Sequence, residues 1–79
     1  MQYVYILRSV GEPNRFYVGT TGDLKTRLAA HNAKAVAHTS KFAPWELQTY
    51  LGFDDRQKAL EFERYLKTGS GRAFAKKQL

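Results

Sequence analysis

The sequence predicts an α+β fold in which helices flank a small three-stranded sheet. Short runs of aromatic and β-branched residues, ended by turn residues, indicate strands. Between and after these runs, apolar residues recur at spacings of three and four, which is typical of amphipathic helices. The expected order is strand, strand, helix, strand, helix, helix. A chain of 79 residues without repeats or linkers is expected to form one domain, residues 1–79.

The first two strands are expected to form a hairpin. Tyr3–Leu7 is the first, Phe16–Gly19 is the second, and a glycine, a proline and an asparagine lie between them. The third strand is expected at Trp45–Leu51, where Trp, Leu, Thr and Leu alternate with other residues.

The first helix is expected to begin after Asp23, whose carboxylate can accept hydrogen bonds from the first turn, and to end near Asn32. The polar stretch Ala33–Lys41 follows it. This stretch is predicted to be an exposed loop.

Two helices are expected after the third strand. Asp54 or Asp55 can cap the longer one, which would run through Lys67 and stop at Gly69. Ser70 can then cap a short basic terminal helix.

The composition favours a polyanionic partner. Thirteen Lys and Arg against seven Asp and Glu give a formal charge of +6, which suits nucleic acid but is also compatible with a merely solvated basic surface. The absence of cysteine excludes disulfides and thiolate zinc sites. No stretch resembles a membrane span or a secretion signal, so we expect a cytoplasmic monomer with no membrane association.

Glu63 is the first residue that the fold alone does not explain. It lies four residues after Ala59 and three before Leu66, on the side of its helix that should face inward. A buried carboxylate needs a cation, which could be a divalent metal or a basic side chain. The simpler alternative is an ion pair with Lys67 one turn later.

Arg27 and His31 share the border of the apolar stripe on the first helix. Arg27 could grip a phosphate through two hydrogen bonds, or its stem could pack while its guanidinium returns to water. His31 could carry a proton near neutral pH, or it could be a C-cap or a surface group. The hydroxyls of Tyr5 and Tyr17 could orient a water and a phosphate oxygen if they project to the same side.

In their order, these residues resemble the GIY-YIG nucleases. YVY at Tyr3–Tyr5 and YVG at Tyr17–Gly19, with eleven residues between them, resemble the paired signatures of that family. Arg27 follows Tyr17 by ten residues, as in the family, and Glu63 lies on the last long helix. The similarity spans the chain and is closest to the small free-standing members. Two departures are Tyr3 in place of the first signature's glycine and Thr20 where some relatives have lysine.

The resemblance implies a metal-dependent endonuclease acting on a nucleic acid, with DNA favoured. Glu63 would bind a single Mg²⁺ or Mn²⁺, and Arg27 would hold the scissile phosphate. Tyr5 or Tyr17 would align or deprotonate the attacking water, and His31 would assist. The basic loop and the terminal helix would follow phosphates on either side, and the candidate nucleic-acid contacts are Lys34, His38, Thr39, Ser40, Lys41, Lys67 and Arg72.

Two other functions stay open at this point. The chain could bind nucleic acid through the same basic face without cleaving it. Less favoured is a protein-interaction domain in which Trp45, Phe53 and other aromatic residues support an apolar contact patch.

Overall fold

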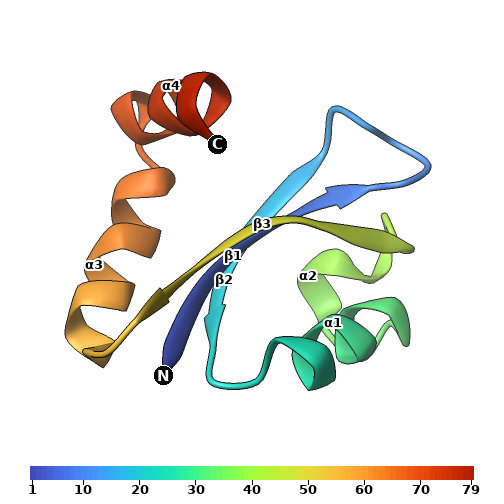
Figure 1. Cartoon of the computed structure of the whole chain (residues 1–79). Coiled ribbons are helices and arrows are strands. Elements are labelled where there is room, and N and C mark those ends of the chain that lie inside the picture. The colour runs from blue at the N-terminus through green and yellow to red at the C-terminus, as the bar shows by residue number, and fades with distance from the viewer.

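The computed structural model describes all 79 residues and contains a three-stranded antiparallel sheet with helices on both faces (Figure 1). The elements in chain order are β1 Gln2–Ser9, β2 Phe16–Thr21, α1 Leu24–Asn32, α2 Ala37–Ser40, β3 Trp45–Phe53, α3 Arg56–Leu66 and α4 Gly69–Gln78. The α+β prediction is confirmed, with one additional short helix, α2.

The strand order β2-β1-β3 makes β1 the central strand and leaves β2 at an edge. Tyr5 on β1 pairs with Gly19 on β2 and with Tyr50 on β3. The ladder between β1 and β3 shifts register between Ile6 and Leu7. Tyr5 and Gly19 therefore face each other directly across the hairpin, which determines the geometry of the site.

Successive residues of β1 enter different cores, because side chains alternate between the two faces of a strand. Val4 and Ile6 pack with residues of α3. Tyr5 and Leu7 pack with Trp45 on the opposite face, where α1 contributes partly buried leucines. Figure 1 accordingly shows α3 and α4 on one side of the sheet and α1 and α2 on the other.

The expectation of an exposed loop at Ala33–Lys41 is wrong in its middle. The segment forms helix α2, and Thr39 within it is fully buried. The Thr39 carbonyl accepts a hydrogen bond from the Trp45 indole Nε1 over 2.8 Å. Side-chain partners distant in sequence therefore hold this polar segment against the sheet.

The turn between α3 and α4 also differs from the expected one. Asp23 and Asp55 cap their helices as predicted, but Thr68 rather than Ser70 caps α4 by accepting a hydrogen bond from the backbone N–H of Gly71. Gly69 accordingly begins α4 and is not the residue that ends α3. The capping hydroxyl therefore lies two residues earlier than the sequence pattern suggested.

Gly71 lets α4 approach α3 closely. A Cβ atom at this buried position would lie 1.8 Å from the carbonyl oxygen of Tyr65 and 2.7 Å from the Cα of Leu66. Only glycine fits there without moving a backbone.

No helix in the structure combines the length and apolar character needed to cross a bilayer.

Candidate active site

The Tyr5 hydroxyl lies at the centre of a polar cluster on the α1 face of the sheet. Tyr5 is only 2% exposed, and its oxygen lies 2.9 Å from the Nε2 atom of His31. Arg27 donates a hydrogen bond from Nε to the same oxygen over 3.4 Å. The hairpin and helix α1 thus bring three predicted site residues into contact.

Gly19 makes room for this hydroxyl. A Cβ atom on Gly19 would lie 2.6 Å from the Tyr5 hydroxyl oxygen, 2.8 Å from its Cζ and 3.0 Å from the ring of Tyr17. Close packing against Tyr5 and Tyr17 therefore explains why the second signature ends in glycine. The two tyrosine rings meet over a bare backbone, with their centroids 6.3 Å apart.

His31 is fully buried, so the interpretation of this residue as a surface group is wrong. Its Nδ1 atom lies 2.7 Å from the hydroxyl oxygen of Thr39, and that hydroxyl donates to the Val36 carbonyl over 3.3 Å. A hydroxyl that donates to a carbonyl must accept from Nδ1–H, which leaves the Nε2 lone pair to accept from Tyr5. A single arrangement of protons therefore satisfies every hydrogen bond from Tyr5 through His31 and Thr39 to the Val36 carbonyl.

Burial and charge reinforce this proton order. Burial is the main cause of a lowered pKa at His31, and the Arg27 charge lowers it further, so the imidazole is neutral at pH 7. Burial also raises the pKa of Tyr5, against the opposing effect of the hydrogen bond from Arg27. The hydrogen bond with Tyr5 raises the pKa of Arg27, which remains a cation. The site therefore pairs a neutral imidazole with a neutral phenol beside a fixed positive charge.

Tyr17 lies next to this cluster and is partly exposed. The centroid of its ring is 5.0 Å from that of His31. Since Tyr5 is almost completely buried, Tyr17 is the tyrosine of the pair with more exposure to solvent.

Glu63 approaches the site from helix α3, on the other face of the sheet. Its Oε1 atom lies 3.5 Å from the Thr20 hydroxyl on β2, next in sequence to Gly19. Its Oε2 atom forms an ion pair with Lys67 over 2.7 Å, which is the simpler alternative considered for this residue. The Glu63 side chain is 19% exposed, so solvent still reaches the carboxylate.

Few acidic side chains are placed to bind a metal ion. The structure contains no group of three or more His, Cys, Asp or Glu residues placed to hold a metal ion. Mg²⁺ is nevertheless commonly bound by one or two carboxylates together with substrate phosphates and several waters. Glu63 at the open edge of β2 fits that mode of binding, provided that a phosphate supplies further oxygens.

The predicted nucleic-acid contacts differ in accessibility. Thr39 has no exposed surface, and its hydroxyl is in contact with Nδ1 of His31. The structure therefore contradicts its assignment as a nucleic-acid contact. Ser40 is partly exposed and donates to the Ala37 carbonyl. The remaining candidates are exposed and belong to two regions, the segment around α2 and the turn from α3 into α4: Lys34, His38, Lys41, Lys67 and Arg72.

The fold is thus an α+β domain with a tyrosine, a histidine and an arginine clustered on the α1 face of a three-stranded sheet. The family model of the GIY-YIG catalytic domain matches residues 1–78. The chain therefore belongs to the GIY-YIG family, whose catalytic domains are nucleases that hydrolyse phosphodiester bonds and generally depend on a divalent metal.

Curated relatives point to the same family. The chain is 38% identical over 71 residues to the structure-specific endonuclease subunit SLX1 of Debaryomyces hansenii, an alignment that covers 81% of this chain and 20% of the relative. The subunit of the same name from Talaromyces marneffei is 42% identical over 65 residues, covering 75% of this chain and 17% of the relative. The chain thus spans only about a fifth of the length of these relatives.

Proposed function

We propose that this chain hydrolyses a phosphodiester bond in DNA and that the series Arg27, Tyr5, His31, Thr39 is the core of its active site. The hydrogen bonds that order this series support the proposal most directly. A histidine and a tyrosine in contact beside an arginine, both with pKa values shifted by burial, are typical of a functional site.

Arg27 supplies the phosphate clamp in this proposal. Its Nε donates to Tyr5, which leaves the terminal guanidinium nitrogens for a phosphate. A phosphate bound there lies close to the Tyr5 hydroxyl, because the same guanidinium group contacts both. The reacting phosphorus and the tyrosine are thereby brought together.

Tyr5 and His31 handle the proton. A water adjacent to the clamped phosphate, oriented by the more exposed Tyr17, passes its proton to the Tyr5 oxygen as the phenol proton moves to Nε2 of His31. Thr39 holds the imidazole in the tautomer that can accept that proton. Arg27 stabilises the negative charge that develops on the tyrosine and phosphate oxygens.

Glu63 would hold the divalent metal, either Mg²⁺ or Mn²⁺. When bound, the ion polarises the phosphate and stabilises the leaving oxygen. Lys67 neutralises the carboxylate through the ion pair and competes for the same oxygen. The contact with the Thr20 hydroxyl holds the carboxylate close to β2 before substrate arrives.

The names of the relatives support a substrate class. The relatives are structure-specific endonuclease subunits, so we propose flapped or branched DNA as the substrate. The net charge of +6 supports a chain that binds DNA as a monomer, because copies repel one another. The word subunit in those names leaves room for a protein partner that selects the target.

An incision assay on linear, flapped and branched DNA with Mg²⁺ or Mn²⁺ tests the proposal. Glu63→Gln and Arg27→Ala are expected to stay folded and to lose cutting by at least about a hundredfold. Glu61→Gln on the exposed face of α3 and Arg56→Ala at its start are the matched controls and should cut like the wild type. Equal cutting by all five proteins would refute the site assignment.

A binding measurement separates the two roles. Glu63→Gln should retain most DNA affinity, because the change removes a metal ligand, whereas Arg27→Ala should weaken affinity as well as cutting. Salt-sensitive binding by the wild type without any product would instead favour a module that binds DNA and does not cleave it.

A further inference from the structure

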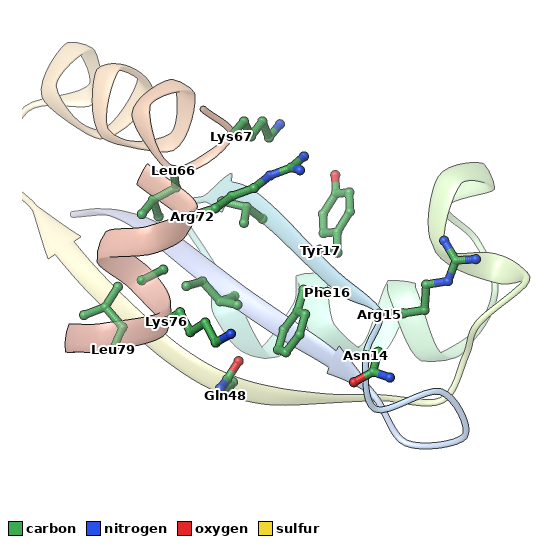
Figure 2. A pocket seen from close by; sticks show the side chains of 13 residues that line it. Asn14, Arg15, Phe16, Tyr17, Gln48, Leu66, Lys67, Arg72, Lys76 and Leu79 are labelled. Carbon is green, nitrogen blue, oxygen red and sulfur yellow. The ribbon is translucent and has the colours of Figure 1, made fainter. Parts of the chain in front are cut away.

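A basic groove runs between helix α4 and the hairpin end of the sheet, on the face opposite to the Tyr5 core (Figure 2). Its volume is about 1010 Å³. Single drug-sized ligands occupy pockets of about 300–1,000 Å³. The groove is therefore large enough for an extended chain molecule. Its wall includes Ile6, Val18 and Leu66 from the sheet and α3.

The charged side chains that line this groove all have one sign. Arg15, Lys67, Arg72 and Lys76 line it, and no Asp or Glu does. Of these four only Lys67 forms an ion pair with a carboxylate, so Arg72 and Lys76, four residues apart on α4, present unpaired charges. A row of unpaired cations with no acidic neighbour is complementary to a phosphate backbone.

Phe16 supplies an exposed aromatic ring in the same groove. It begins β2, is 53% exposed and belongs to neither core cluster. Figure 2 shows its ring within the groove that Lys76 also lines. A ring exposed next to cations is the arrangement by which proteins stack unpaired bases while holding the adjacent phosphates.

The groove is continuous with the candidate active site. Tyr17, next in sequence to Phe16, lines the groove and also packs against His31. Lys67 lines the groove and also contacts Glu63. A strand lying in the groove would therefore meet the proposed cleavage site at the end formed by Tyr17 and Lys67.

We propose that the groove binds the single-stranded arm of a DNA substrate, with one unpaired base stacked on Phe16 and the following phosphates held by Arg72 and Lys76. This inference rests on the proposed function and adds the means by which the domain distinguishes an unpaired strand from duplex. A second copy of the chain is a poorer occupant, because its net charge of +6 would oppose the cations of the groove.

The test measures binding with metal chelated, so that no cleavage is needed. Fluorescence anisotropy compares a duplex carrying a single-stranded overhang with a blunt duplex of the same length. Phe16→Leu, which keeps an apolar side chain but removes the ring, should weaken binding of the overhang substrate by about tenfold, the scale of one lost base stack, and leave the blunt duplex unchanged. Phe16→Tyr should restore binding. Tyr50→Leu, which removes an equally exposed aromatic outside the groove, should have no effect.

A base analogue makes the stacking visible. 2-Aminopurine in the overhang should be quenched by the wild type and by Phe16→Tyr but not by Phe16→Leu. Arg72→Gln and Lys76→Gln should each lower the slope of log affinity against log salt by about one for the overhang substrate. Lys77→Gln, on the same helix but outside the groove, should leave that slope unchanged.

The two proposals fail in different ways. If Phe16→Leu binds both DNAs like the wild type, or weakens both equally, the groove proposal is overturned while incision by the wild type still supports the nuclease. If the wild type discriminates the overhang through Phe16 but never cuts, the nuclease proposal is overturned and the groove stands. A change from dimer to monomer in Phe16→Leu, measured by sedimentation, would assign the ring to self-association and overturn the groove proposal.

Discussion

Replacing Gly19 by alanine should disrupt the site without removing any polar side chain. The new Cβ would lie 2.6 Å from the Tyr5 hydroxyl oxygen, and this contact must open by about 0.4 Å or more to reach 3.0 Å. The Tyr5 ring cannot retreat without lengthening its 2.9 Å contact with His31. We expect about 1–3 kcal/mol of overpacking and about 1 kcal/mol more from the weakened buried hydrogen bond.

Thermal unfolding and single-turnover incision measure the two consequences. Each kcal/mol corresponds to roughly 4–8 °C in a domain of this size, so Gly19→Ala should lower Tm by at least about 8 °C. Cleavage should fall by at least about tenfold, because displacements near 1 Å can cost about a hundredfold. Gly11→Ala is the control, since no atom lies within 4 Å of its Cβ. A Gly19→Ala protein with the Tm and rate of the wild type would refute the packing argument.

Two further predictions concern stability. Gly71→Ala should lower the free energy of unfolding, measured in urea, by about 2 kcal/mol or more, because its Cβ would lie 1.8 Å from the Tyr65 carbonyl oxygen. Gly69→Ala should not lower it, because no atom lies within 4 Å of a Cβ at that position. Equal effects of the two substitutions would contradict the close contact between α3 and α4. His31 has a lowered pKa in the folded chain, so as pH falls through about 6.5 it takes up a proton in the unfolded chain before it does so in the folded chain. The free energy of unfolding should therefore decrease progressively below that pH. His31→Gln should remove this part of the slope of urea midpoint against pH, and parallel curves for the two proteins would show that His31 carries no such linkage.

The strands and three helices could be predicted from sequence because their signals are local. Asp23 caps α1 and Asp55 caps α3, as expected from short polar residues before helical patterns. Thr68 and Ser70 are both acceptable caps by type. The close contact at Gly71 decides between them, and that contact depends on how α4 packs against α3.

Within the site, Arg27 and Tyr5 could be expected to meet, but the burial of His31 could not. Nothing local in the sequence indicates that Thr39, eight residues later, turns back to bind the imidazole and leaves the surface. The sequence therefore predicts an exposed loop at Ala33–Lys41, although Thr39 in this segment is buried. The groove beside Phe16 was also not foreseen, because α4 and the hairpin form it together only in the folded chain.

Trp45 is the only tryptophan in the chain, and its indole donates to the carbonyl of Thr39, the residue that holds His31. The chain thus contains an intrinsic fluorophore two hydrogen bonds away from the imidazole. Any event that displaces α2, whether ligand arrival or partial melting, would alter the surroundings of this indole. Its emission offers a label-free signal for the surroundings of His31 in the unmodified protein.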